Sequence, residues 1–548
     1  MKQEKKTFFF IIILAFILRF FSLGKTPPGL YWDEVSLGYN AYSILKTARD
    51  EHGEILPYSR FIAFGDYKPP GYIYATILPI AIFGLNEFSV RFPSALSGVL
   101  MVIITYFLIK TLFPNKKIKF FNQGISLALA ASFLLCISPW SLHLSRVAFE
   151  ANLAALFNLL AIYFFIKGIK TNKNLILLSS VFFALTLYTF NSNRLLTPIL
   201  IFGLTLIFFK NLIKIKKTAV LAIIIFITLV LPLIPHLTSR EGKLRWHEVN
   251  IFSNFDVILE SNKRIDLDGG GFWAKKIHHR FIGHALNFLK HYFDHFKGDY
   301  LFLSGDVNPR LSVRYVGELY LVELPFFLAG IFFLLNSIRK KSAQLILFWF
   351  LAAPIPAATA RETPHALRTL SILPTPQIIS ALGIYQIFLI LYKIINKNFK
   401  ILFSVLICFA FLLNILYYLY AYYSLFPKRY IGEWLPSYKE LVQFLNQYQD
   451  AKQILVTQAY GRPYIYFLFY NQYSPRKFQL EAKKERDWFG FWQVLGIDNL
   501  IFTDDLSKIS NTGKILLALP PNVELVGFEK IKTIYEDDKP TFEIFKRE

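Results

Sequence analysis

Two adjacent acidic residues, Asp33 and Glu34, follow the first long apolar run of the chain. Carboxylates held close to a membrane surface are costly to desolvate, so a pair at that depth is a candidate for function. A carboxylate within hydrogen-bond reach of a hydroxyl can act as a general base. The alternative is an ordinary solvated turn after Pro27 and Pro28, and the pair alone does not decide between the two.

A lysine, Lys68, stands between Tyr67 and two prolines, directly before an apolar stretch that is too short to cross a bilayer. A lysine ammonium at a membrane surface is a natural partner for a phosphate. The prolines favour a fixed turn that would hold Lys68 in one place. The alternative is a lysine that only extends its charge towards water.

A third carboxylate, Glu150, lies in an otherwise apolar segment, SRVAFEANL. A lone carboxylate there is expensive unless it lines a polar cavity. Arg146 stands one helical turn earlier, so an ion pair between the two is the competing interpretation.

The segment 359–369, TARETPHALRT, contains Arg361, His365 and Arg368. Arginine guanidinium groups suit phosphate or diphosphate because they present several donors in a fixed plane. We expect a phosphate-binding connection here, with a plain solvated loop as the alternative.

A fifth segment, 291–310, mixes aromatic residues with His295, Lys297, Asp306 and Arg310. It could meet the lipid surface and a substrate. Histidine beside carboxylates could also bind a divalent metal, but the spacing fits no zinc template. The sequence therefore leaves a metal site open.

The elements that must position these residues are membrane spans. Of the 548 residues, 54% are hydrophobic and only 18% charged, and the mean hydropathy is +0.41. Apolar runs are long enough to cross a bilayer. We predict eleven spans: 8–23, 88–109, 123–140, 148–166, 175–190, 195–209, 218–235, 319–337, 343–357, 370–392 and 400–423.

The formal net charge of +23 would suit nucleic acid, but its distribution excludes that function. Lys and Arg gather in every second connection between the predicted spans, and the intervening short connections are poor in them. This alternation is typical of the positive-inside rule. It predicts a cytoplasmic N-terminus and a C-terminus on the other side of the membrane.

Three segments then lie outside: 24–87, 236–318 and 424–548. The tail, 424–548, reads as a small α/β domain, because SYKELVQFLNQY has helical periodicity and QILVT and NLIFTDD look like strands. VELVGFEKIKTIYED and TFEIFKR look like a closing hairpin. The expected fold is mainly α, a polytopic transmembrane bundle over 1–423 with an extracytoplasmic α/β domain at the C-terminal end.

These segments together resemble the GT-C class of membrane glycosyltransferases, and within it family 39, the protein O-mannosyltransferases and bacterial aminoarabinose transferases. YWDE at 31–34 is similar to the acidic pair of the first outer loop, and DYKPP at 66–70 to the lysine-proline element that meets the carrier phosphate. PHALR at 364–368 looks like the basic element of a later loop. YTFNSNR at 188–194 resembles a tyrosine-rich turn of bacterial members.

The resemblance implies a polyprenyl-phosphate sugar as donor and a hydroxyl of a lipid, glycan or protein as acceptor, in the plasma membrane. Asp33 would be the catalytic base, supported by Glu34 and Glu150, where the family more often has aspartate. The resemblance gives the donor phosphate to Lys68, Arg368 and His365, and substrate contacts to Asp66, Tyr67, Arg194, His295, Lys297 and Arg310. Tyr67 stands where the aminoarabinose enzymes have a glutamate that helps to hold a metal.

Three alternatives remain. A transporter or flippase shares the spans, but transporters usually place ionisable residues near the bilayer midplane in repeated halves, and no repeat is found here. A scaffold with a binding tail leaves the acidic pair and Lys68 unexplained. A ligase of lipid-linked intermediates would keep the carrier and change the transferred group.

Overall fold

The computed structural model describes the chain except residues 1, 65, 121–122, 395 and 487–491. The chain divides into two compact units. Unit 1 consists of Met1–Arg19, Leu96–Ser145 and Glu150–Ala421, and unit 2 consists of Phe20–Ala95, Arg146–Phe149 and Tyr422–Glu548.

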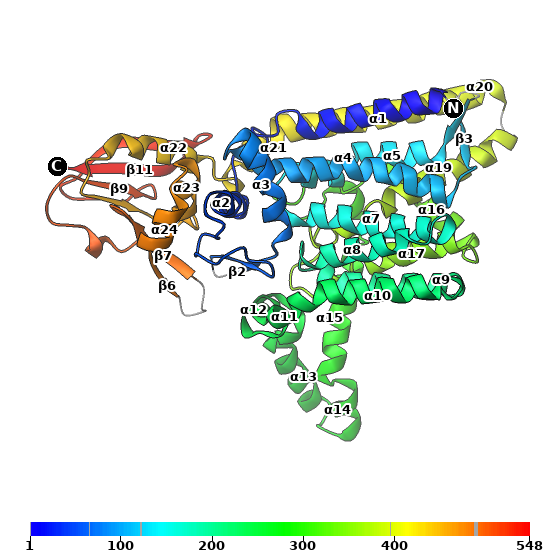
Figure 1. Ribbon diagram of the computed structural model, residues 1–548, viewed down its shortest axis with the longest axis horizontal. Coiled ribbons are helices and arrows are strands. Elements are labelled where there is room, and N and C mark those ends of the chain that lie inside the picture. The colour runs from blue at the N-terminus through cyan, green and yellow to red at the C-terminus, as the bar shows by residue number, and fades with distance from the viewer. Residues whose placement is uncertain (1, 65, 121–122, 395, 487–491) are drawn as a thin grey trace. The chain divides into compact units, whose positions relative to one another are not determined.

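Every predicted span falls on apolar helix. The helices are α1 (Lys2–Phe20), α4 (Glu87–Leu112), α5 (Leu127–Ile137) with α6 (Pro139–Ser145), α7 (Glu150–Lys170), α8 (Leu175–Leu187), α9 (Asn193–Lys214), α10 (Lys216–Val230), α16 (Leu324–Asn336), α17 (Lys341–Ala352) with α18 (Ile355–Ala358), α19 (Thr375–Ile394) and α20 (Lys397–Tyr420). Within unit 1, α7, α8, α9 and α10 lie side by side (Figure 1). The predicted helical membrane bundle is confirmed.

Among the described residues, seven helices are long and apolar enough to cross a membrane, or eight if α5 and α6 form one span. The two helices meet at a bend of 54°. The predicted span 123–140 is wrong at its start, because β4 (Gln123–Ser126) pairs with β3 (Lys117–Phe120) and Ser126 then caps α5. Three further apolar helices are shorter, so the exact number of spans stays a prediction.

The long connection after α10 is almost entirely helical and belongs to unit 1. Its helices are α11 (Ile234–Thr238), α12 (Arg240–Val249), α13 (Phe255–Leu267), α14 (Phe272–Ile277) and α15 (Arg280–Asp294). A π-helical turn, Asp299–Leu303, follows, and an irregular segment then leads to α16.

The first part of unit 2 is built on α2 (Trp32–Thr47), the hairpin β1 (Phe61–Ala63) and β2 (Asp66–Lys68), and α3 (Gly71–Phe83). Gly38 lets α2 pack closely, because a Cβ there would lie 2.6 Å from Val90 and 2.8 Å from Phe469. Phe469 belongs to α23 (Pro463–Tyr470), so α2 packs against a helix of the tail.

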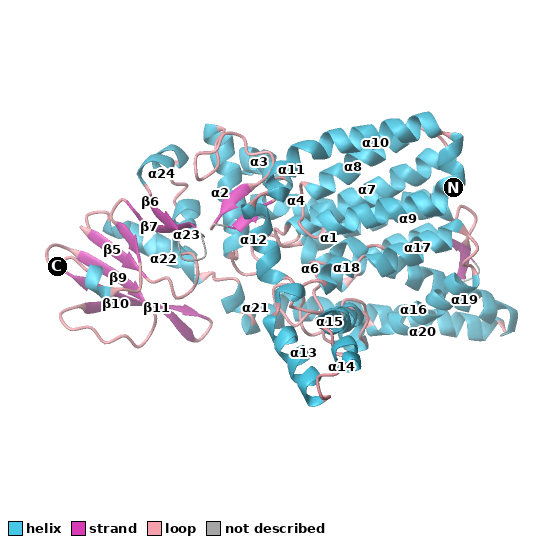
Figure 2. Ribbon diagram, turned by 90° about the horizontal axis from the view of Figure 1, so that it is seen from below, coloured by secondary structure: helices cyan, strands magenta, loops and turns pink. Residues whose placement is uncertain are grey.

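The tail carries a seven-stranded mixed sheet with strand order β10-β11-β9-β5-β8-β7-β6. Its strands are β5 (Gln453–Val456), β6 (Lys483–Arg486), β7 (Trp492–Ile497), β8 (Leu500–Phe502), β9 (Ile515–Leu519), β10 (Glu529–Glu536) and β11 (Lys539–Arg547). β5 is parallel to β8 and β9, and the other pairs are antiparallel. Figure 2 shows that the strands gather in the tail.

The sheet packs with α22 (Ser437–Leu445) and α23, and α24 (Pro475–Glu481) packs against α2. Leu455, Leu517 and Phe545 are among the buried side chains of its core. The expected helix, strands and closing hairpin of an α/β tail are all present, so the predicted fold class is confirmed. The division of the chain at residue 423 stays a prediction.

Candidate active site

The acidic pair lies in the first turn of α2. Tyr31 has extended backbone angles and caps this helix, and Glu34 Oε2 accepts the Tyr31 N–H at 3.2 Å. Carboxylates are stabilised at a helix N-terminus because unpaired N–H groups and the helix dipole favour negative charge there. The local sequence therefore fixes both Asp33 and Glu34 at one end of α2.

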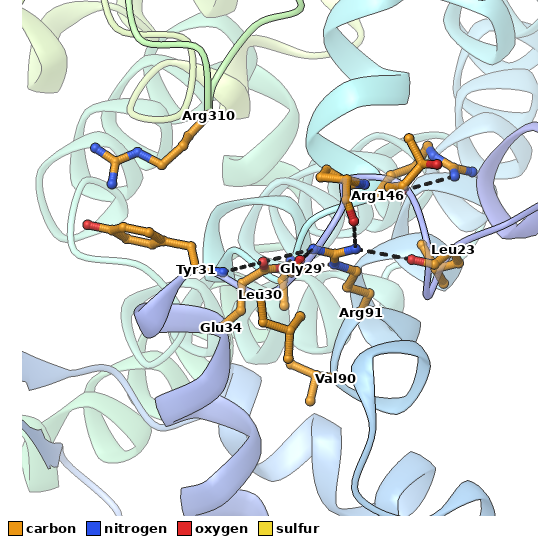
Figure 3. Close-up of polar contacts among 12 residues, drawn as sticks. Leu23, Gly29, Leu30, Tyr31, Glu34, Val90, Arg91, Arg146 and Arg310 are labelled. Carbon is orange, nitrogen blue, oxygen red and sulfur yellow. Dashed lines mark hydrogen bonds and ion pairs between the residues drawn. The ribbon is translucent and has the colours of Figure 1, made fainter. Parts of the chain in front are cut away.

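Glu34 is fully buried and holds this region together (Figure 3). Arg91 donates to both of its oxygens, from Nε at 3.0 Å and from Nη2 at 3.1 Å, and the Ala148 N–H donates at 2.7 Å. Arg91 also donates to the carbonyls of Leu23 and Gly29. A bidentate, fully hydrogen-bonded carboxylate of this kind is suited to positioning the loop rather than to exchanging protons with a substrate.

Asp33, by contrast, keeps about a quarter of its side chain exposed and forms an ion pair with Lys68, with Oδ1 3.2 Å from Nζ. The hairpin register brings Lys68 opposite Phe61, and Pro69 and Pro70 follow it into α3. Two segments far apart in the sequence thus place a carboxylate and an ammonium together. This arrangement can accept a proton and bind an anion at neighbouring points.

The neighbours of Lys68 in the hairpin belong to the fold. Tyr67 is buried, with the guanidinium of Arg60 over its ring at 5.5 Å. Asp66 pairs with Ala63 through the backbone, and its side chain lies outside the described part of the chain.

Arg146 and Glu150 are placed in different units. Arg146 is buried, donates from Nε to the Tyr422 hydroxyl at 3.0 Å and from Nη2 to the Thr26 carbonyl at 3.2 Å. Glu150 is the first residue of α7 and is 7% exposed. Its catalytic assignment stays a prediction.

A second polar cluster, in unit 1, joins two segments that the sequence analysis singled out separately. The His365 N–H donates to His295 Nε2 at 3.1 Å, and the Ala366 N–H donates to Asp306 Oδ2 at 2.6 Å. His295 Nδ1 lies 2.9 Å from the carbonyl of His291, which fixes the tautomer with hydrogen on Nδ1. The connection 359–369 is therefore anchored on the segment 291–310.

Burial sets the charge of this cluster. It lowers the pKa of His295 to about 4, so the ring is neutral at pH 7. It raises the pKa of Asp306 to about 6, although N–H groups of Asn308 and Ala366 donate to the carboxylate. It raises the pKa of Glu318, whose Oε1 accepts the Asp306 N–H at 3.2 Å, well above its usual range. Two neighbouring buried carboxyl groups thus resist ionising together.

The other residues of unit 1 that were predicted to contact substrate have partners within unit 1. Lys297 pairs with Asp294 at 2.7 Å and is mostly exposed, and Arg310 Nε is 3.4 Å from Asn308 Oδ1. The Arg368 N–H donates to His365 Nδ1 at 3.3 Å. Arg194 lies in the first turn of α9 and donates to the Leu187 carbonyl.

Acid is expected to destabilise the protein at His295, whose Nε2 accepts the His365 N–H. A folded-state pKa near 4, below the ordinary 6.5, means that the neutral ring contributes its full stability above pH 6.5 and loses it as the pH falls through 4. The difference between the two pKa values of His295 corresponds to about 3 kcal/mol of folding stability. His295→Gln, which keeps an acceptor but does not titrate, should lose less thermal midpoint between pH 7 and pH 4 than the wild type. His278→Gln, at a partly exposed histidine, should follow the wild type, and equal acid sensitivity in both variants would contradict this account.

Two arginines inside predicted spans are fully buried. Arg91, inside the predicted span 88–109, was not considered, although a lone charge in an apolar run signals a buried partner. Arg19, inside the predicted span 8–23, is buried in unit 1 and donates to Ser141 Oγ at 2.8 Å and to the carbonyl of Cys136 at 3.1 Å.

No group of three or more His, Cys, Asp or Glu side chains that could hold a metal ion is found among the described residues. The residues around Asp33 that are described supply one partly exposed carboxylate and a lysine, which is a poor donor set for a divalent cation.

Residues 67–236 match the family model described as dolichyl-phosphate-mannose-protein mannosyltransferase. A curated relative, the Bacillus subtilis (strain 168) protein YkcB, provisionally named a mannosyltransferase, is 32% identical over 115 residues. That segment is 21% of this chain and only 15% of the relative.

The fold is similar to that of ArnT from Cupriavidus metallidurans, with a TM-score of 0.57 in the apo state and 0.56 in the complex with undecaprenyl phosphate. The match covers 98% of this chain and 97% of ArnT at 12% identity. The Archaeoglobus fulgidus oligosaccharyltransferase AglB, with an inhibitory peptide and a dolichol-phosphate, matches with a TM-score of 0.51 at 13% identity. That match covers 85% of this chain and 64% of AglB.

The partial family match and the shared fold confirm the predicted resemblance to the GT-C class, and the apolar helices support a multi-pass membrane protein. Within this class the resemblance is to ArnT in fold and to mannosyltransferases over part of the sequence.

Proposed function

We propose that this protein is a membrane glycosyltransferase that moves a sugar from a polyprenyl-phosphate carrier to an acceptor hydroxyl. One observation carries the proposal: the partly exposed ion pair of Asp33, at the start of α2, with Lys68. The adjacent Glu34 is buried and neutralised by Arg91, so Asp33 is the carboxylate of this pair that a substrate can reach.

Asp33 acts as the general base in this proposal. A hydroxyl is a poor nucleophile until its proton is removed, and a carboxylate within hydrogen-bond reach can remove it. The acceptor oxygen then forms a bond to C1 of the sugar as the bond from C1 to the carrier phosphate breaks. The proton goes to Asp33, and a single direct displacement inverts the anomeric centre.

Lys68 binds the departing phosphate. That group leaves with negative charge and needs a fixed cation rather than a proton. The carrier phosphate takes the place of Asp33 as the partner of Lys68, which releases the carboxylate to act as a base. Binding of the donor to Lys68 thereby activates Asp33 as the base.

The roles of the remaining candidate residues are those that the resemblance implies. Glu34 positions the start of α2, and Glu150 orients the acceptor or supports the base. Arg368 and His365 are given to the donor phosphate as further cations and donors. These roles are predictions for mutagenesis.

The relatives support the carrier class. ArnT was solved with undecaprenyl phosphate and AglB with a dolichol-phosphate, and the matching family model is that of dolichyl-phosphate-mannose-protein mannosyltransferases. The acceptor is proposed only as a hydroxyl of a lipid, glycan or protein. We place the protein in the plasma membrane, and the basic connections between spans support an N-terminus in the cytoplasm and a tail outside.

The function is tested with purified protein and a panel of radiolabelled polyprenyl-phosphate sugars, with a membrane extract supplying acceptors. Transfer of label from one donor, with release of free polyprenyl phosphate, would support the proposal. No release from any donor by folded protein would favour a transporter or a ligase of other lipid-linked groups.

Lys68→Ala is expected to raise the donor KM by about tenfold or more, because a charge-assisted contact to phosphate contributes roughly 1.5–3 kcal/mol. The acceptor KM should change little. Lys477→Ala removes an exposed lysine that pairs with Asp498 at 2.7 Å and is the matched control. An unchanged donor KM in Lys68→Ala would remove this residue from the phosphate site.

A further inference from the structure

The long helix α15 is amphipathic, but its polar face packs on the protein and its apolar face is exposed, the reverse of a helix on a soluble protein. Its polar residues face the rest of unit 1: His291 Nδ1 lies 2.8 Å from the Ala360 carbonyl, and Asp294 Oδ2 accepts the Thr363 hydroxyl at 2.9 Å. Its apolar residues recur at helical spacing and are exposed: Phe281, Ile282, Leu286, Leu289 and Phe293. An exposed apolar face of this size needs an apolar environment.

The apolar face continues onto the neighbouring helices. Exposed apolar side chains of α13 and α14 include Phe255, Leu259, Leu267, Phe272, Trp273 and Ile277. A hollow of about 680 Å³ between α13 and α15 is lined mainly by apolar side chains, with Arg280 at the start of α15 and His284 as its polar members. We call α13, α14 and α15 the arm.

The charged residues of the arm indicate what covers its exposed apolar face. The segment 272–290 contains Lys275, Lys276, Arg280 and Lys290 and no Asp or Glu. Basic residues beside aromatic and aliphatic ones are typical of helices that lie in the interface of membranes bearing anionic lipids.

The position of the arm in unit 1 agrees with a lipid surface. Figure 1 shows the arm projecting sideways from the bundle, across the direction of α10 and near the end at which α11 begins. The span that includes α10 has only 11% of its apolar window buried, so it faces lipid. The exposed face of the arm therefore continues a surface that is already in the membrane.

We infer that the arm lies in the membrane interface, with its apolar face in the boundary of the hydrocarbon and its lysines and Arg280 at anionic headgroups. The occupant of the hollow is then lipid hydrocarbon. This contact adds a lipid-binding surface beyond the proposed transfer reaction and does not depend on it.

The test is spin labelling of the full-length protein in nanodiscs of phosphatidylglycerol and phosphatidylcholine. Labels at Phe281→Cys and Leu286→Cys, in a background lacking Cys136 and Cys408, report the apolar face. Glu260→Cys, at an exposed charged position of α13, is the matched control. A separate protein that lacks only Cys136 keeps native Cys408, exposed on α20, as the lipid reference, and Val526→Cys in the tail of the cysteine-free background gives the water reference.

The labels on the apolar face should collide with oxygen far more than with a water-soluble nickel complex, in a ratio close to that of Cys408. Glu260→Cys should resemble Val526→Cys. Access of nickel to residues 281 and 286 would place the face in water. Exclusion of both reagents would mean that a second copy or another polypeptide covers it, and either result would overturn the inference.

A second measurement needs no cysteine. Lipids brominated on their acyl chains should quench part of the tryptophan fluorescence, and Trp273→Phe should remove a measurable share of that quenching. Unchanged quenching in Trp273→Phe would also count against the arm lying in lipid.

Discussion

Asp33→Asn is expected to lower turnover by about 10³-fold, within the range that a positioned general base contributes. Asparagine has nearly the same size and still accepts hydrogen bonds at the start of α2, so the helix should form as before. It does not take the proton of the acceptor hydroxyl at neutral pH. Turnover is measured as release of labelled polyprenyl phosphate at saturating donor.

Donor binding separates loss of the base from loss of the fold. Asp33→Asn frees Lys68 from its 3.2 Å ion pair, so the variant should bind the donor at least as tightly as the wild type. Glu54→Gln, which removes an acid that pairs with Arg60 at 2.5 Å in the same unit, should keep normal turnover. Near-normal turnover in Asp33→Asn would exclude it as the base.

The sequence predicted the helical bundle because lipid imposes a strong and local constraint. A span needs a long apolar run, and every such run became a helix. The start of 123–140 failed because Gln123–Ser126 pairs with Lys117–Phe120, and pairing between strands does not appear in a hydropathy window. The elements of the tail were predicted because helical and alternating periodicity differ clearly there.

The candidate residues could be named from the sequence, but not their division of labour. Asp33 and Glu34 are neighbours of the same chemical type, and a resemblance assigns them together. Successive residues of a helix point about 100° apart. In this helix one carboxylate is about a quarter exposed beside Lys68 and the other is buried against Arg91. The contact of 291–310 with 359–369 depends on tertiary packing, so it could not be predicted from the sequence either.

Arg91→Leu is expected to destabilise unit 2 by about 3–5 kcal/mol, because it leaves Glu34 as a buried charge without its partner. The wild-type guanidinium satisfies both carboxylate oxygens and also donates to the carbonyls of Leu23, Pro27 and Gly29. It further stacks over buried Trp434 at 5.7 Å. The measurement is the thermal midpoint of the purified protein in detergent.

The double variant Glu34→Gln/Arg91→Leu distinguishes an uncompensated charge from lost packing. If the buried charge dominates, neutralising Glu34 should recover a large part of the lost midpoint, although the three carbonyls remain without their donor. Arg264→Leu breaks an ion pair with Glu260 whose side chains are both more than half exposed, so it should change the midpoint little. A midpoint for Arg91→Leu as close to wild type as that of Arg264→Leu would mean that Arg91 does not hold the start of α2. Asp33 would then owe its position beside Lys68 to the β1–β2 hairpin and the cap of α2 alone.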